Sequence, residues 1–275
     1  MKEIIVSVFL TIEGIAAASG LLFHDKQLHI ISDNSDYLYQ YQLKSETLQK
    51  TALLERSGQQ ELVTKKEKAD FEAIAQDRKM LYIFGSGSGK KRNSLVKYDR
   101  KTKKKQTVDM SQSYASMQKK FGIEAEDFNI EGALIWENEL WLFNRGNGPN
   151  QKNGIFVLDK KTLQANRFVE VVLPALKSVQ TGFTDATRVG NSIYFIAAAE
   201  DSNSSYHDGQ INGTLIGKLD PKTKKVLYTE LLSETHKFEG IAFYNENKDG
   251  QTFLLCEDPD NEQALSTIYQ VHLPK

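Results

Sequence analysis

Four short stretches of the sequence share one pattern: an apolar residue, a glutamate, a glycine or alanine, and a second apolar residue. They are Ile12-Glu13-Gly14-Ile15, Phe71-Glu72-Ala73-Ile74, Ile130-Glu131-Gly132-Ala133 and Phe238-Glu239-Gly240-Ile241. A degenerate copy, Phe183-Thr184-Asp185-Ala186, lies between the third and the last. With Thr184 as the counterpart of the glutamates, successive copies are 59, 59, 53 and 55 residues apart. A period of this size indicates one supersecondary unit that is repeated along the chain.

Each unit contains four runs of residues typical of β-strands. In the second unit these runs are residues 72–75, 80–84, 95–99 and 107–110. Alternation is clear in the first unit, where Tyr37, Tyr39 and Tyr41 fall on one face of the third strand. Four antiparallel strands in a repeat of about 55 residues are typical of a β-propeller blade.

A second repeated phrase joins the third strand of a unit to the fourth. It places an aspartate at the start of a turn, in Tyr98-Asp99-Arg100-Lys101-Thr102, Leu158-Asp159-Lys160-Lys161-Thr162 and Leu219-Asp220-Pro221-Lys222-Thr223. An aspartate at this position can accept hydrogen bonds from the next backbone N–H groups. These carboxylates are therefore predicted to stabilise turns and not to act in catalysis.

The two ends of the chain each supply part of one blade. After Glu239 only three strands follow, the last at residues 267–272, whereas a strand at residues 3–10 precedes the first unit. If this strand is the outer strand of the last blade, the ring closes and no sheet edge is left exposed. The sequence thus predicts an all-β, five-bladed propeller of four-stranded blades, one domain over residues 1–275. Residues 111–127 are expected to add a short helix between two blades.

The composition excludes several classes of protein. The net charge is −1 with 26% charged residues of mixed sign, so no electrostatic signature of nucleic-acid binding is present. No apolar run approaches the ~20 residues of a membrane span, and the apolar residues 4–10 are interpreted as a strand and not as a signal peptide. The single cysteine, Cys256, excludes an intrachain disulfide and favours a reducing compartment such as the cytoplasm. The oligomeric state stays open.

Carboxylates are expected to meet on the propeller axis, because the first strand of every blade lines the central channel. The residues at the entry to these strands are Glu13, Glu72, Glu131 and Glu239, with Thr184 or Asp185 in the fifth place. Carboxylates that converge must be protonated, paired, spread apart, or bridged by a cation. Oxygen ligands without clustered His or Cys favour Ca²⁺. The alternative is that each glutamate accepts hydrogen bonds from backbone N–H groups of the adjacent blade.

Polar loops between the second and third strands open on the same face as these carboxylates. Their candidate ligand-binding residues are Asp33, Lys90, Arg92, Asn144, Arg145 and Glu257. The cationic members suit a small anionic molecule bound beside a central cation. His207 and His236 lie in connections on this face and are the candidates for acid–base catalysis.

The Glu-Gly phrase, followed by an apolar strand and a polar loop, resembles calcium-dependent propeller families. Calcium-activated apyrases are similar in blade number, and the resemblance implies an axial Ca²⁺ held partly by glutamates at Glu13, Glu72, Glu131 and Glu239, with hydrolysis of nucleoside phosphates. The gluconolactonase and paraoxonase group shares the phrase on six blades. Over its whole length the chain resembles bacterial five-bladed propellers without an assigned activity.

Two functions are consistent with these patterns. The first is a Ca²⁺-dependent hydrolase of a phosphoester, a nucleotide or a lactone, in which the ion polarises the scissile group or positions water. The second is a propeller that binds a ligand or a protein without catalysis, with a structural ion or none. The fold alone does not distinguish them, because propellers support both.

Overall fold

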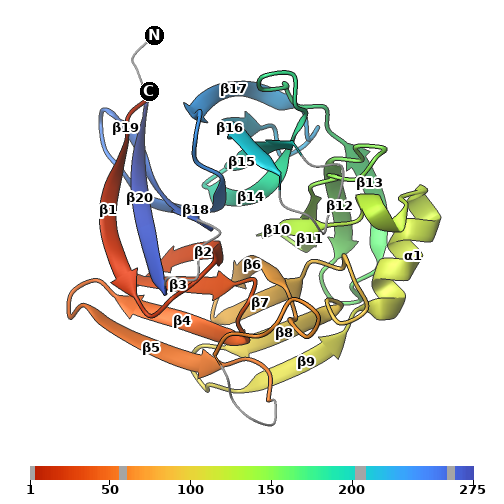
Figure 1. Cartoon of the computed structure of the whole chain (residues 1–275), viewed down its shortest axis with the longest axis horizontal. Helices are drawn as coiled ribbons and strands as arrows, with labels where there is room; N and C mark the ends of the chain where they lie inside the picture. Colours follow the sequence, from red (N-terminus) through yellow and green to blue (C-terminus); the bar gives the residue numbers. More distant parts are fainter. Residues whose placement is uncertain (1–3, 56–60, 202–208, 259–263) are drawn as a thin grey trace.

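Five four-stranded antiparallel sheets stand in a ring around a central axis (Figure 1). The computed structural model describes residues 4–55, 61–201, 209–258 and 264–275. The predicted all-β, five-bladed propeller is therefore confirmed. In every blade the strand nearest the axis comes first and the next three follow outward, except that the last blade takes its outer strand from the other end of the chain.

The blades have the following strands, each named from the axis outward. The first blade comprises β2 (Ala18–His24), β3 (Gln27–Ser32), β4 (Tyr37–Gln42) and β5 (Thr47–Ala52). The second comprises β6 (Phe71–Asp77), β7 (Met80–Gly85), β8 (Ser94–Asp99) and β9 (Lys105–Asp109). The third comprises β10 (Ile130–Trp136), β11 (Glu139–Asn144), β12 (Gly154–Asp159) and β13 (Ala165–Glu170). The fourth comprises β14 (Thr181–Val189), β15 (Ser192–Asp201), β16 (Gln210–Leu219) and β17 (Val226–Ser233).

The fifth blade is assembled from both ends of the chain. Its strands are β18 (Phe238–Glu246), β19 (Gly250–Glu257), β20 (Leu265–Pro274) and, outermost, β1 (Val6–Glu13). β1 pairs antiparallel with β20, from Val6 opposite Val271 to Glu13 opposite Leu265. This pairing confirms the predicted closure of the ring by the N-terminal strand. It also covers the sheet edge that β20 would otherwise expose.

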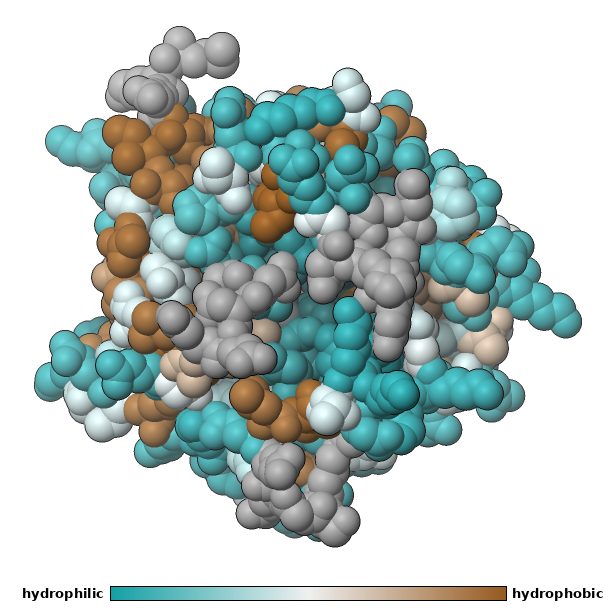
Figure 2. Space-filling view, viewed as in Figure 1, coloured by the Kyte–Doolittle hydropathy of each residue, from teal (hydrophilic) through white to brown (hydrophobic). Residues whose placement is uncertain are grey.

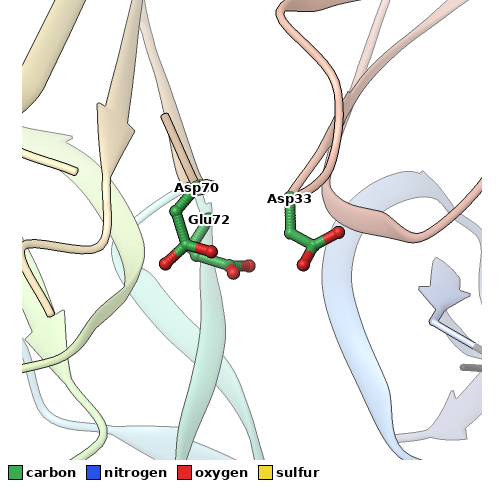
Figure 3. A group of neighbouring side chains, drawn as sticks. All are labelled: Asp33, Asp70 and Glu72. Atoms are coloured by element: carbon green, nitrogen blue, oxygen red, sulfur yellow. The ribbon is translucent and has the colours of Figure 1, made fainter. Parts of the chain in front are cut away.

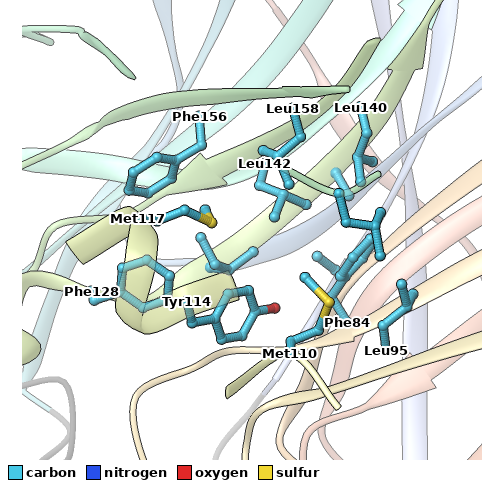
Figure 4. Packing of buried hydrophobic residues seen from close by; sticks show 14 of the residues in the cluster. Phe84, Leu95, Met110, Tyr114, Met117, Phe128, Leu140, Leu142, Phe156 and Leu158 are labelled. Atoms are coloured by element: carbon cyan, nitrogen blue, oxygen red, sulfur yellow. The ribbon is translucent and has the colours of Figure 1, made fainter. Parts of the chain in front are cut away.

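The apolar core lies between neighbouring blades, because the middle strands of each sheet bury side chains on both faces. One such cluster fills the space between the second and third blades (Figure 4). Helix α1 (Ser111–Phe121) covers its outer side with Tyr114 and Met117, and the Tyr114 hydroxyl donates to the carbonyl oxygen of Gly85 at 3.0 Å. The helix ends at Gly122 in the left-handed conformation, and a short 3₁₀ turn, η1 (Ala125–Asp127), leads into β10. The expected helix between two blades is confirmed.

The repeated aspartate turns have the predicted structure. The Asp99 carboxylate accepts hydrogen bonds from the backbone N–H groups of Lys101 and Thr102 at 2.9 and 3.0 Å, and Asp159 and Asp220 do the same in their turns. The hydrogen bond from Thr102 is the main reason that the pKa of Asp99 is lowered to about 2. These carboxylates therefore fasten the turns between the third and fourth strands.

Candidate functional site at the channel mouth

A β-bulge at the head of each inner strand presents one residue at the channel. The register between β6 and β7 shifts between Phe71 and Ala73, so Glu72 has no partner in the ladder, and the other four blades shift at the equivalent place. We call these five bulge residues the ring positions; they are Ser19, Glu72, Glu131, Thr184 and Glu239. Three of the four predicted glutamates and the predicted Thr184 thus occupy equivalent positions.

The position predicted for Glu13 is wrong. Glu13 ends the outer strand β1, and its side chain is exposed. The matching residue of the first blade is Ser19, which is followed by Gly20 as Glu131 is followed by Gly132. Ser19 precedes Glu72 by 53 residues, the same step that separates Glu131 from the degenerate copy at 184. The prediction relied on the glutamate in Ile12-Glu13-Gly14-Ile15, whereas the residue in the equivalent position is Ser19, at the head of the β2–β3 pair.

The hydroxyl groups at two ring positions connect neighbouring blades. Ser19 donates to the carbonyl oxygen of Phe71 at 2.5 Å, and Thr184 donates to that of Phe238 at 2.8 Å. Asp185 does not face the channel as a free ligand, because its carboxylate accepts the backbone N–H of Ile241 at 2.9 Å. Between the fourth and fifth blades, Asp185 therefore makes the side-chain-to-backbone contact that the alternative interpretation predicted for the glutamates.

Two chains of ion pairs surround the glutamates. In the first chain, Lys68 lies between Asp33 and Asp70, with its Nζ 2.7 Å from the Asp70 Oδ1, and Arg92 donates from Nη1 to the other Asp70 oxygen at 2.9 Å. Ser86 also donates to Asp70. All four charged side chains of this chain are at most 18% exposed. The strength of such pairs grows as water is excluded.

The second chain joins the third, fourth and fifth blades. Arg145 contacts Glu131 at 3.3 Å and Glu200 at 2.6 Å, and Lys237 contacts Glu200 at 3.2 Å and Glu239 at 2.9 Å. Every side chain in it is at most 9% exposed. Glu131 and Glu239 therefore already have cationic partners, so the predicted convergence of bare carboxylates holds only in part.

Glu72 differs from the other two ring glutamates. Within the described part of the chain, its carboxylate has no hydrogen-bond or ion-pair partner, although it lies beside Asp70 and faces Asp33 (Figure 3). One oxygen atom from each of these three carboxylates lies within 4.8 Å of the others, and Asp70 is buried while the other two are half-buried. This acidic triad can hold a metal ion.

We call the two ion-pair chains together with Glu72 the channel mouth. Its negative charges outnumber its positive charges by two. The two chains and Glu72 together contain six carboxylates and four cationic groups. Burial, and then the charge of Asp70, raise the pKa of Glu72 well above its ordinary value. Burial likewise raises the pKa of Glu239 to about 8 against the opposing charge of Lys237. Burial thus favours the protonated forms of Glu72 and Glu239, which reduces the excess negative charge of the mouth.

The raised pKa of Glu239 predicts that the folded state loses stability as pH rises from about 5 to 8. The folded state holds the proton on Glu239 up to about pH 8, whereas the unfolded chain releases it near its ordinary pKa of 4.5. Glu239→Gln keeps the neutral form, so its unfolding free energy should fall less over this range. Urea unfolding at several pH values measures the difference, and parallel curves for both proteins would contradict this account.

Not every predicted ligand residue faces the mouth. Lys90 is exposed, and no ion pair is found for it among the described residues. The side-chain amide of the buried Asn144 accepts the N–H of Asn129 and donates to the carbonyl oxygens of Asp127 and Lys152, so it braces its loop and has no donor left for a ligand. Asp33, Arg92 and Arg145 do lie at the mouth, within the ion-pair chains.

Of the two predicted catalytic histidines, only His236 lies among the described residues, and it contacts Glu257 and not the acidic triad. The Nδ1 atom of His236 lies 2.7 Å from a carboxylate oxygen of Glu257, and the His236 ring stacks on Phe238. Glu257 also accepts a hydrogen bond from the Tyr269 hydroxyl. This cluster borders a groove between the outer strands of the fourth and fifth blades. His207 lies outside the described residues. A catalytic role for either histidine stays a prediction.

Four charged residues of the mouth were missed in the sequence. They are Lys68, Asp70, Glu200 and Lys237. Three of them could have been found by period-2 alternation, because Lys68-Ala69-Asp70-Phe71-Glu72 and Lys237-Phe238-Glu239 place charged residues on either side of buried apolar residues. Glu200 carries no such signal, because its contacts depend on how the end of β15 approaches Arg145 and Lys237.

The mouth opens into a hollow with hydrophilic walls on the face shown in Figure 2. Beside it, a small cavity of about 160 Å³ lies between the third and fourth blades. Arg145 and Glu200 form one side of this cavity, and Gln151, Gln180 and backbone groups of Gly146 and Gly148 form much of the rest. The mouth therefore has room for a small polar molecule next to the second ion-pair chain.

Comparisons with known proteins agree with this architecture. The structure is similar to Myxococcus xanthus glutaminyl cyclase, with a TM-score of 0.59 and 13% identity over 99% of this chain and 98% of that one. It is also similar to a luciferin-regenerating enzyme, with a TM-score of 0.51 and 9% identity over 98% and 96% of the two chains. At these identities the likeness concerns the fold alone.

Other comparisons bear on membranes and on family membership. No helix in the described ranges has the length and apolar character needed to cross a membrane. No curated protein matches the chain by sequence. A family model, described as a family of unknown function (DUF6929), matches residues 14–273, which is nearly the whole propeller. The chain therefore belongs to the DUF6929 family.

Proposed function

We propose that the channel mouth binds a divalent cation, with Ca²⁺ as the first candidate, and that the acidic triad of Asp33, Asp70 and Glu72 supplies its protein ligands. The observation that supports this most is Glu72, a carboxyl group that lies beside two other carboxylates and has no hydrogen bond or ion pair of its own in the described chain, although its charge acts on Lys68. Ca²⁺ accepts 6–8 oxygen ligands in irregular geometry, so three carboxylates leave positions for water or a substrate.

The charge balance also favours a divalent ion. Two carboxyl groups of the mouth, Glu72 and Glu239, have pKa values raised by burial. A bound dication would replace their protons and leave the mouth close to neutral. Metal binding should therefore release protons, as is general where ligands must be deprotonated. A monovalent cation would satisfy only half of the excess.

Lys68 is the natural competitor of such an ion. Its ammonium group contacts both Asp33 and Asp70, so a metal ion at the triad must displace it or share the carboxylates with it. Lys68→Met removes this competitor, and the variant is expected to bind Ca²⁺ about tenfold more tightly because one positive charge near the site is lost. Glu72→Gln removes a ligand charge, and about a tenfold loss of affinity is expected.

Titration calorimetry tests the proposal. Ca²⁺ and Mg²⁺ are titrated at pH 7 in two buffers with different heats of ionisation, and the difference gives the protons released, expected to be about one to two per ion. Glu170→Gln, at an exposed ion pair on β13, is the matched control and should bind as the wild type does. Failure of both Ca²⁺ and Mg²⁺ to bind, or unchanged binding in Glu72→Gln, would refute the metal site.

We propose hydrolysis as the reaction to be tested first at this centre, with a phosphoester, a nucleotide or a lactone as substrate. A bound Ca²⁺ would polarise the scissile group or position water. The small cavity beside Arg145 offers space for the remainder of such a molecule. A panel of these substrates, with or without EDTA, is the test. Glutaminyl cyclisation, the activity in the name of the Myxococcus structure, belongs in the same panel.

The alternative is a non-catalytic propeller that binds a ligand or a protein. One observation favours it: the cationic groups Arg145 and Lys237 each contact two carboxylates and so are not poised for an anionic substrate. Turnover that depends on Ca²⁺ and is lost in Glu72→Gln would support the enzyme. Ca²⁺ binding without turnover across the panel would support the binding protein.

A further inference from the structure

A second cavity lies at the opposite end of the channel from the acidic triad. It has a volume of about 430 Å³ and is lined by residues of all five inner strands, β2, β6, β10, β14 and β18. Sites for small molecules in proteins are typically concave and ~300–1,000 Å³ in volume. The size and the axial position of this cavity suit one small ligand, distinct from anything bound at the mouth.

The walls of this cavity are about equally polar and apolar. The apolar part is formed by residues of the inner strands, among them Leu22, Ala75, Ala133, Ala186 and Ala242. The four alanines are buried and belong to the cores between blades, so the wall is rigid. An apolar part of a ligand that contacts this portion of the wall would lose contact with water, which favours its binding.

Charged groups stand only at the rim, on or near the turns that end the inner strands. Arg78 and Arg188 are both present there, and neither guanidinium group has a carboxylate partner within the described ranges. The guanidinium of Arg188 lies 4.3 Å from the ring centre of Trp136. The rim carboxylate of Asp77 is paired with Lys160 at 2.6 Å. The remaining charged groups of the described rim are then one carboxylate, Glu137, and two guanidinium groups, so the net charge of the rim is positive.

We infer that this second cavity binds a small organic anion, whose apolar part contacts the apolar residues of the wall and whose carboxylate is held by Arg78 and Arg188. The arginines come from the second and fourth blades, so one anion would connect non-adjacent blades. Arginine suits this role because its planar group can pair with a carboxylate through two parallel hydrogen bonds. The inference is independent of a metal ion at the mouth.

Tryptophan fluorescence and calorimetry in the presence of EDTA test the inference, since EDTA removes any contribution of the metal site. Trp136 and Trp141 are the two tryptophans of the chain, and their rings lie 5.8 Å apart. Benzoate and hexanoate should bind saturably and change the emission, because a carboxylate would draw Arg188 away from Trp136. Benzamide and benzylamine, of similar shape without the negative charge, should bind at least tenfold more weakly.

Variants localise the binding. Arg78→Gln and Arg188→Gln should each weaken benzoate binding about tenfold by calorimetry. Lys161→Gln changes the net charge equally at an exposed turn outside the cavity and should have no effect. Thr187→Phe, at a half-buried lining position, should block binding by its volume. Absence of saturable binding by both acids, equal binding of benzamide, or undiminished binding by both arginine variants would overturn the inference.

Discussion

Asp70→Asn is expected to lower the free energy of unfolding by about 3–5 kcal/mol. Asp70 accepts from Arg92 at 2.9 Å, contacts Lys68 at 2.7 Å and accepts a hydrogen bond from Ser86. The asparagine fills the same space but leaves two buried cations with one negative charge fewer. Breaking a buried pair costs far more than breaking an exposed one, because the remaining charge has lost its water.

Denaturant unfolding of the variant measures this loss, and an exposed pair supplies the control. Lys152 contacts Glu170 at 3.1 Å, with both side chains at least one-third exposed. Glu170→Gln should therefore cost less than about 1 kcal/mol. If both variants lose the same small amount, water must reach the first ion-pair chain, and the low-dielectric account of the mouth is wrong.

Removal of residues 1–13 is expected to cost about 3 kcal/mol or more and to make the protein prone to aggregation. β1 contributes the buried Ile12 and the partly buried Phe9 and Leu10 to the core between the fifth and first blades. Burial of one large aliphatic or aromatic side chain contributes about 1.5–3 kcal/mol. Without β1, the backbone groups of β20 that pair with it form an open edge that can recruit other chains.

Complementation distinguishes this effect from general damage. A synthetic peptide of residues 4–13, added to the truncated protein, should restore its denaturation midpoint in a concentration-dependent way, because a partner of the folded state stabilises it by mass action. A peptide with Ile12→Asp should fail, since the buried position cannot accept an unpaired charge. A truncated protein as stable and as monomeric as the full chain would refute the closure argument.

The sequence by itself determined the architecture. The spacing of the Glu-Gly phrases gave the number of blades, the aspartate turns marked the ends of the third strands, and the unmatched strands at the two ends implied closure. These features are local and repeated, so each copy supports the others. Glu72, Glu131, Thr184 and Glu239 could also be assigned to equivalent positions, because a repeated unit places equivalent residues around one axis.

Only the tertiary structure decided which carboxylates stay without a cation. Glu72, Glu131 and Glu239 look alike in the sequence, yet Arg145 pairs with Glu131, Lys237 pairs with Glu239, and Glu72 is left beside Asp33 and Asp70. Glu200 reaches Arg145 from 55 residues away and Lys68 reaches Asp33 from 35 residues away, separations that no local pattern encodes. Electrostatic energy depends on separation in space and on burial, and both are fixed only when the five blades close into a ring.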